Sequence, residues 1–266
     1  MRVLFITAGI GSDDFHAAGA RLLKQASDFD IFDSLICVKE SDLVNICPKI
    51  YQVFTEEELS VQNRFGFYSW KSSIANSAMK GFWGEFDTVF YLDAGCEMVP
   101  SSWNRKKLIN LIDQSIHSGI VAFSINTLEV QYSKKLLLEN MKASSEIANS
   151  NQFQSGSWIL SGQKGQEFAR KWDEKVWESR IFVDNSISPN GEDPQFSAHR
   201  HDQSIFSILC KQFGVIPYYE NPPGPGISLF RIIVNSRFPF WWSRNRTGQT
   251  IIPKSISRIL LKTLRK

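Results

Sequence analysis

An acidic residue stands directly after an apolar run in the segment 88–97 (TVFYLDAGCE). The run 88–92 is typical of a strand buried on both faces, which would place Asp93 at the strand's carboxyl end. Ligands of open α/β sheets bind at that edge, where a carboxylate can hold a divalent ion against phosphates or accept a hydrogen bond from a ribose hydroxyl. It can equally close a turn. From the residues alone, both interpretations stay open.

A second acidic residue stands beside two of the four histidines, in the segment 198–203 (AHRHDQ). This segment follows a polar loop and opens a predicted helix, whose N-terminus would favour an anion. His201 could act as a base or contact a phosphate, and Asp202 could take part in chemistry or simply cap the helix. We expect His199 to be a loop residue. A His/His/Asp metal site is conceivable at this spacing, but no fourth ligand is evident.

Small residues mark two further places where a ligand could approach the backbone. Thr7, Ala8 and Gly9 follow the first apolar run, and residues 154–157 (QSGS) interrupt a later one. Gly156 suits the close approach of a sugar, and a strand bulge would explain it as well. The patterns GxGxxG, GxxxxGK[ST], GxSxG and HExxH do not occur, which argues against nicotinamide cofactor sites, P-loop NTPases, α/β-hydrolases and zincins.

Alternating strands and helices must position these residues. Wholly apolar strands that alternate with helices indicate a mostly parallel sheet with helices on both faces, so we predict a Rossmann-like α/β fold. The predicted strands cover residues 3–7, 33–38, 50–54, 88–92, 121–125, 152–160 and 215–219. The predicted helices cover residues 16–27, 70–82, 106–118, 134–148, 163–179 and 204–213.

Taken in this order, several segments resemble bacterial glycosyltransferases of the GT-A fold from polysaccharide and lipopolysaccharide gene clusters. GFYSWKSSIANSAM and TVFYLDAGCEMV are similar to the family's G-x-x-x-W-K stretch and to its strand that ends in an Asp-centred motif. FITAG, ARLLKQASDFDIFDS, QFQSGSWIL and HRHDQSIFSIL agree with further family segments, so the resemblance runs through most of residues 2–220. It implies transfer of a sugar from a nucleotide-sugar donor to a carbohydrate or lipid-linked acceptor in surface polysaccharide synthesis.

The resemblance also implies roles for individual residues. Those implied to bind the donor are Thr7, Ala8, Arg21, Lys71, Asp93 and Gly95. Those implied to act in catalysis are Asp93, His201 and Asp202, and those implied to contact the acceptor or the sugar are Gln154, Ser155, Gly156 and Gln203. From the residues alone, Arg21 and Lys71 could also be ordinary solvated side chains on helices.

One departure from the family pattern bears on the cofactor. Asp93 corresponds to the first acid of a DxD motif, and Gly95 stands where the second acid would be. This counts against a divalent metal such as Mn²⁺ or Mg²⁺, for which Asp93 and, less directly, Glu97 would be the ligands. A basic residue such as Lys71 could instead balance the charge of the leaving diphosphate.

The C-terminal part of the chain differs in charge from the rest. Residues 231–266 contain nine basic and no acidic residues, whereas the other residues carry 21 basic against 27 acidic. We therefore predict a catalytic domain at 1–226 and a basic, aromatic and amphipathic tail at 227–266. The tail could bind an anionic membrane surface, or its aromatic residues could pack under the core. An acidic body without a nucleic-acid motif argues against nucleic-acid binding.

The cysteines and the N-terminal residues indicate the cellular compartment, and two alternative functions stay open. Four cysteines without a CxxC pair indicate free thiols, and the first apolar run is short and followed by Asp13 and Asp14, which favours a core strand over a signal peptide. We expect a cytoplasmic protein that is peripheral on the inner face of the cell membrane. The alternatives to a glycosyltransferase are a nucleotidyltransferase and a non-catalytic nucleotide-sugar binding or scaffold protein.

Overall fold

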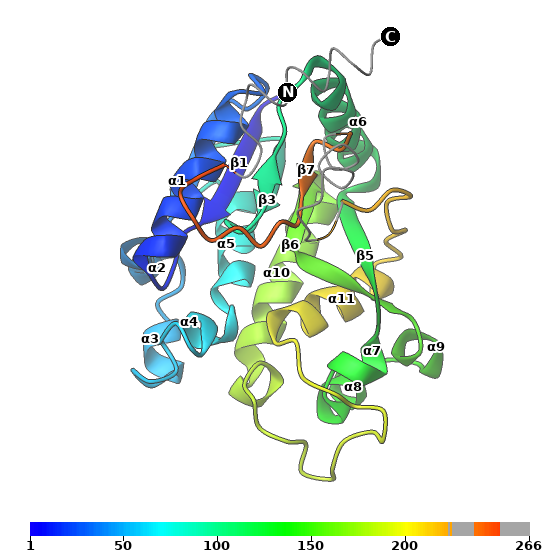
Figure 1. Cartoon of the computed structure of the whole chain (residues 1–266). Coiled ribbons are helices and arrows are strands. Elements are labelled where there is room, and N and C mark those ends of the chain that lie inside the picture. The colour runs from blue at the N-terminus through cyan, green and yellow to red at the C-terminus, as the bar shows by residue number, and fades with distance from the viewer. Residues whose placement is uncertain (223, 225–236, 251–266) are drawn as a thin grey trace.

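A five-stranded sheet forms the centre of the protein, in the order β2-β1-β3-β6-β5 (Figure 1). The computed structural model describes residues 1–222, 224 and 237–250. The strands are β1 (Val3–Ala8), β2 (Ser34–Val38), β3 (Thr88–Leu92), β5 (Ile120–Leu128) and β6 (Asn151–Ser161). β1 pairs in parallel with β2 and β3, while β6 runs antiparallel to both β3 and β5, so every strand of this sheet except β6 points the same way. The predicted α/β class with a mostly parallel sheet is confirmed.

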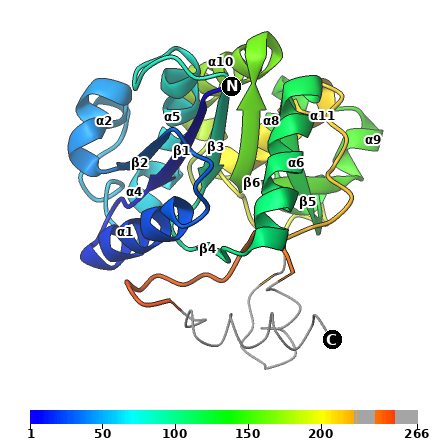
Figure 2. The same ribbon diagram turned by 90° about the horizontal axis from the view of Figure 1, so that it is seen from above.

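Helices cover both faces of this sheet, as the view from above shows (Figure 2). One face carries α1 (Asp13–Ser27) and α6 (Ser102–Ser118), and the other carries α5 (Trp70–Met79), α10 (Gly162–Glu178) and α11 (Asp202–Gln212). Successive strand residues point to opposite faces, so Phe5 and Phe90 belong to one apolar cluster and Ile6 and Tyr91 to the other. Each such buried side chain stabilises the fold by about 1.5–3 kcal/mol. This explains why the strands are apolar throughout.

Local signals decide where helix α6 begins and ends. The hydroxyl of Ser101 accepts a hydrogen bond from the backbone N–H of Asn104 at 3.1 Å, which caps the N-terminus of the helix. Gly119 ends the helix with φ of 81°, a left-handed conformation that glycine adopts without strain. The chain can then turn directly into β5.

The segment 50–54 was expected to be a strand and is instead part of a helical stretch. Short helices α2 (Glu40–Ile46) and α3 (Ile50–Val53) follow β2, so this prediction is wrong. Ile46, Ile50 and Phe54 are spaced four residues apart and all are buried, whereas Tyr51 is exposed. That spacing matches the period of a helix and not the alternation of a strand.

Two other predicted elements differ in the structure. Residues 215–219 form no strand, and Ile216 and Tyr219 there are 83% and 80% exposed. The predicted helix 134–148 is divided into α8 (Lys135–Asn140) and α9 (Ser145–Ala148), because Lys142 adopts a positive φ of 51° between them. The remaining short elements are α4 (Arg64–Phe67), α7 (Glu129–Tyr132) and the 3₁₀ turn Arg180–Phe182.

Part of the predicted tail belongs to the folded body. Strand β7 (Phe240–Trp241) pairs antiparallel with β4 (Glu97–Met98), and both residues of β7 are fully buried. Phe238, Phe240 and Trp241 therefore pack in the core, in agreement with the second interpretation of the tail, whereas Trp242 is half-buried. Residues 251–266, with the predicted amphipathic helix, lie outside the described residues. Within the described part of the chain, no helix is long and apolar enough to cross a membrane.

Candidate functional site

A cleft of about 970 Å³ opens at the edge of the sheet where β1 and β3 end. Most of the predicted site residues line it: Ala8, Lys71, Asp93, Gly95, Gln154, Ser155, Gly156, His201, Asp202 and Gln203. They come together because β6 is antiparallel, so that its N-terminal half reaches the same edge as the carboxyl ends of β1 and β3. Thr7, Arg21 and Glu97 do not line the cleft.

Asp93 lies at the centre of the cleft's polar residues. Its backbone N–H donates to the carbonyl of Gly156 at 2.8 Å, which fixes the turn after β3 against β6. The ammonium of Lys71 lies 2.8 Å and 3.0 Å from the two carboxylate oxygens, and the hydroxyl of Tyr91 donates to one of them at 2.8 Å. Asp93 is therefore held from three sides, with 37% of its side chain exposed to the cleft.

Gly156 allows this arrangement by having no side chain. A Cβ atom at this position would overlap the carboxylate of Asp93. The pairing of β5 with β6 also loses its register between Ala122 and Ser124, opposite residues 153–158 of β6. The irregular pairing lies where the sequence suggests a bulge, and the group closest to Gly156 is the chain's own carboxylate. The approach of a sugar to Gly156 stays a prediction.

Lys71 is a buried cation that faces two carboxylates. Its side chain is 4% exposed, and it also lies 4.6 Å from the centre of the Tyr68 ring. Burial lowers the pKa of Lys71, but the charges of Asp93 and Asp202 outweigh this effect and hold its pKa above the ordinary value. The side chain therefore stays protonated over the whole physiological range.

Asp202, the first residue of α11, is a second carboxyl group in the same cleft. The residue is 1% exposed, and its Oδ2 atom has no hydrogen-bond partner among the described residues. Burial raises the pKa of Asp202 to about 7, against the opposing effects of Lys71 and of a hydrogen bond with Ser155. A carboxyl group in this state can take up or release a proton near neutral pH.

His201 has a fixed and neutral ring. Its Nδ1 lies 2.7 Å from the carbonyl of Val183, and its Nε2 contacts the guanidinium of Arg64. Since Arg64 can only donate, Nε2 accepts and the proton is on Nδ1. Burial lowers the pKa of His201 to about 4, so the ring supplies no positive charge to a phosphate at neutral pH. It instead holds Arg64 at the cleft.

The backbone around His201 is strained. His201 has φ of 51° and ψ of −125°, and positive φ values recur at Arg64, Phe65, Phe67 and Tyr68. Such conformations cost about 1–3 kcal/mol each and gather at functional sites. Four of these five residues line the cleft. No sequence pattern signals this strain, because none of the five is a glycine.

Gln203 has its amide orientation set by a buried chain of hydrogen bonds. Gln152 donates to the carboxylate of Glu129 at 2.9 Å, so its carbonyl oxygen is left as an acceptor. Gln203 donates to that oxygen at 3.0 Å. Glu129 is itself paired with Lys211 at 2.7 Å. Gln203 therefore keeps its carbonyl oxygen as an acceptor, and the second hydrogen of its amide as a donor, for hydroxyl groups in the cleft.

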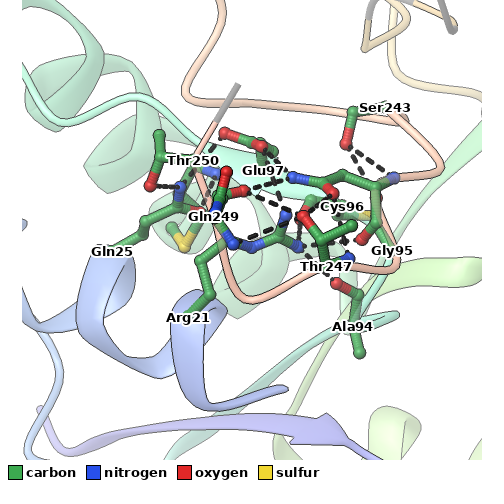
Figure 3. Close-up of polar contacts among 12 residues, drawn as sticks. Arg21, Gln25, Ala94, Gly95, Cys96, Glu97, Ser243, Thr247, Gln249 and Thr250 are labelled. Atoms are coloured by element: carbon green, nitrogen blue, oxygen red, sulfur yellow. Dashed lines mark hydrogen bonds and ion pairs between the residues drawn. The ribbon is translucent and has the colours of Figure 1, made fainter. Parts of the chain in front are cut away.

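Arg21 and Glu97 form a buried ion pair next to the turn that follows Asp93 (Figure 3). The two side chains are 2% and 1% exposed, and the guanidinium lies 3.2 Å from the carboxylate. Arg21 also donates to the carbonyls of Ala94 and Cys96 at 2.7 Å and 2.8 Å. Neither Arg21 nor Glu97 lines the cleft. Arg21 fixes the turn that carries Asp93.

The donor set does not fit a divalent metal ion. Of the residues that the structure describes, only Asp93 and Asp202 supply carboxylates to the cleft, and an ion at Asp93 would have to displace the Lys71 ammonium from both oxygens. Glu97 faces Arg21 and Gln25 instead. Across the described ranges, there is no group of three or more His, Cys, Asp or Glu side chains that could hold a metal.

Sequence reasoning missed the arginines of this cleft. Arg64, Arg200, Arg244 and Arg246 all line it, together with Trp242. Arg200 packs over the ring of Tyr132 at 4.1 Å and Arg246 over that of Phe15 at 5.2 Å. The charge pattern of the sequence places Arg244 and Arg246 in the tail. The one sequence feature that indicates their place in the folded body is the run RFPFWWSRNR, in which four aromatic residues precede them.

Comparisons with known proteins give only remote likenesses. No protein-family model matches the sequence, and no curated protein matches it. Among solved structures, the apo form of mouse xyloside xylosyltransferase 1 has a TM-score of 0.47 and 11% identity, covering 95% of this chain and all of that one (100%). A glycosyltransferase involved in the glycosylation of the major capsid of PBCV-1 has a TM-score of 0.46 and 11% identity, with 98% and 100% covered.

Proposed function

We propose that this chain is a glycosyltransferase of the GT-A type, which moves a sugar from a nucleotide-sugar donor to a hydroxyl of a carbohydrate or lipid-linked acceptor. One observation carries the proposal: a single cleft holds Asp93, fixed by Lys71, beside Asp202, a buried carboxyl whose Oδ2 has no partner among the described residues. At about 970 Å³ the cleft suits a ligand of nucleotide-sugar size. The sequence resemblance supports the same reaction.

The donor side of the cleft would be formed by the ends of β1 and β3. Ala8 and Gly11 line it without bulk and would border the nucleoside, and Asp93 would accept a hydrogen bond from a sugar hydroxyl. Lys71 carries a permanent charge between the two carboxylates and would stabilise the leaving diphosphate. The chain thereby supplies a cation of its own where a divalent ion would otherwise act.

Asp202 would act on the acceptor. As a base it takes the proton of the acceptor hydroxyl, the acceptor oxygen bonds to the anomeric carbon, and the bond from that carbon to the diphosphate breaks. The electron pair of the broken bond leaves with the nucleoside diphosphate. Gln203 and the residues 154–156 would orient the hydroxyls of the sugars, since they line the same part of the cleft.

The cellular role follows from the resemblance alone. We extend the proposal to assembly of surface polysaccharide or lipopolysaccharide by a cytoplasmic protein at the inner face of the cell membrane. Residues 251–266 would be the part that meets anionic lipid, since they carry five basic and no acidic residues.

The test is release of free sugar and nucleoside diphosphate from a panel of nucleotide sugars. We expect the full-length protein to hydrolyse one donor slowly without an acceptor, with EDTA present, and to do so faster than Asp93→Ala. A melting-temperature rise with one donor would identify it by linkage. Binding without release would instead indicate a scaffold protein. Consumption of a nucleoside triphosphate would indicate a nucleotidyltransferase.

A further inference from the structure

Residues 242–249 form one wall of the cleft and are tied to both of its sides. The indole N–H of Trp242 donates to the hydroxyl of Ser157 on β6 at 3.0 Å. The hydroxyl of Ser243 and the backbone N–H of Asn245 donate to the carbonyl of Gly95 at 2.7 Å and 2.9 Å. In Figure 1 the segment runs in orange from β7 across to α1. We call residues 242–249 the C-terminal strap.

Buried polar contacts anchor the strap from below (Figure 3). Asn245 is 7% exposed, and its amide donates to Glu97 at 2.6 Å and to the carbonyl of Gln249 at 2.7 Å. Its own carbonyl accepts from the guanidinium of Arg21 at 3.2 Å. Thr247 donates to the amide oxygen of Asn245 from both its backbone and its hydroxyl. The Arg21–Glu97 pair therefore sets the position of the strap.

The strap presents alternate residues to the cleft. Trp242, Arg244 and Arg246 line the cleft, whereas Asn245 between them is buried on the opposite side. Among the described residues, neither Arg244 nor Arg246 has a carboxylate within 4.0 Å in an ion pair, although two acidic residues line the same cleft. A fixed backbone thus holds two guanidinium groups at a ligand-sized cavity, and no described carboxylate pairs with either.

The other cations of the cleft also indicate an anionic ligand. Arg64 and Arg200 also line it, so four arginines and Lys71 stand against Asp93 and Asp202. Burial lowers the pKa of Arg200, and the nearby charge of Arg244 lowers it further. Like charges that face one another cost free energy unless an anion lies between them. The cleft is therefore built for a ligand with more than one negative charge.

Gly95, which stands where a DxD motif would have its second acid, lies next to the strap. A Cβ atom at Gly95 would lie 3.6 Å from the Cα of Arg244. The glycine that replaces the second acid of the DxD motif is thus packed against the backbone of an arginine. A basic residue stands beside the place where a metal-binding carboxylate would stand.

We propose that the C-terminal strap is the diphosphate-binding element of the cleft, with Arg244 and Arg246 pairing with the phosphate oxygens of the donor. Guanidinium groups bind phosphate through two parallel charge-assisted hydrogen bonds. The ligand class is a diphosphate ester, bound through arginines and Lys71 in the absence of a divalent ion. This inference rests on the proposed function for its biological ligand, but the anion site itself can be measured without any sugar transfer.

The experiment is calorimetric titration of the full-length protein with inorganic pyrophosphate in the presence of EDTA. Arg244→Gln and Arg246→Gln are each expected to weaken binding about tenfold, and the double variant more, because each removes charge-assisted hydrogen bonds. Arg237→Gln is the matched control, since Arg237 is exposed in the same part of the chain and does not line the cleft. It should leave the affinity unchanged. Thermal melts of each variant check that it is folded.

The possible results separate the two proposals. If the wild type binds pyrophosphate and both strap variants bind it equally well, the strap proposal is overturned while the glycosyltransferase proposal stands. If the wild type binds no pyrophosphate without a metal, the anion site itself is overturned. Weakening at Arg244 and Arg246 but not at Arg237 supports the strap, even if no donor sugar is ever released.

Discussion

Asp202 is a residue whose charge should change within the working pH range of the protein. Its pKa is raised to about 7 because it is buried, whereas in the unfolded chain it lies near 3.8. The folded protein therefore binds the proton of Asp202 more tightly than the unfolded chain does. Below about pH 4, the protonated carboxyl stabilises the folded state relative to its stability at neutral pH. As pH rises from about 4 to about 7, that contribution is lost, to a limit of about 4 kcal/mol.

Asp202→Asn should accordingly be more stable than the wild type at neutral pH and not at acid pH. Asparagine fills the same space without a charge to bury, so the gain in the free energy of unfolding should grow between about pH 4 and about pH 7. Urea denaturation at about pH 4 and at about pH 7 measures this gain in the free energy of unfolding. Donor turnover in the same variant should fall about 100-fold or more, as for loss of a general base. A stability difference independent of pH would contradict the assignment of the raised pKa.

Lys71→Met tests the cation at the same site. The charge of Lys71 holds down the pKa of Asp202, so its removal should move the pH–activity profile of donor hydrolysis to higher pH. It should also weaken binding of the diphosphate product, since the leaving group loses its nearest cation. Lys80→Met, at the exposed end of α5, is the control and should change neither property. An unshifted profile in Lys71→Met would refute the coupling between the two groups.

At the scale of the elements, two neighbouring tryptophans at the end of the short strand β7 are expected to have different roles. Trp241 is fully buried, and Trp242 lines the cleft. Trp241→Ala should lower the free energy of unfolding by about 3–5 kcal/mol, because a large buried side chain leaves a cavity. Trp242→Ala should cost much less stability and should weaken pyrophosphate binding by loosening the strap from Ser157. Equal effects of the two substitutions on stability would show that the strap is part of the core.

Sequence patterns predicted the elements well where local periodicity and burial agree. The strand at 88–92 and the helix at 163–179 lie where expected to within a residue, since each pattern matches its own period. The segment 50–54 is too short for its pattern to tell strand from helix. Asp93, Lys71 and Asp202 could be foreseen because each sits next to a recognisable element boundary.

The strap could not be foreseen from sequence. Its place depends on Asn245 pairing with Glu97 and Arg21, contacts between residues far apart along the chain. Composition instead placed Arg244 and Arg246 with the basic residues that follow them. Arg21, expected to bind the donor, is buried outside the cleft, whereas Arg244 and Arg246 of the predicted tail line it. Burial, which the sequence does not display, decides which cation can meet a ligand.

At the scale of the whole molecule, two truncations distinguish the folded body from a membrane-binding end. Removal of residues 251–266 deletes five basic and no acidic residues, which takes the formal net charge from +3 to −2. This variant should keep its melting temperature and pyrophosphate binding and should lose binding to anionic liposomes, measured by flotation. Liposome binding that survives the deletion would place the membrane contact elsewhere.

The longer truncation, after residue 226, is expected to behave differently. It also removes β7 and Asn245, so the carboxylate of Glu97 would lose a buried hydrogen bond and the loss of Phe240 would leave a cavity in the core. The variant should be unfolded or aggregated. If the shortened protein were soluble and melted cooperatively, the strap would not be needed for the fold.

The pairing of β4 with β7 also sets an order of events during synthesis. Glu97 and Met98 leave the ribosome long before Trp241 and Phe240, the residues with which they pair. The residues of the five-stranded sheet and its helices are made first, and the wall of the cleft that carries Arg244 and Arg246 is made after all of them. A nascent chain that ends before β7 would therefore lack both a buried partner of Glu97 and two arginines of the cleft, so completion of the fold and competence to bind diphosphate would come together once residues 237–249 are made.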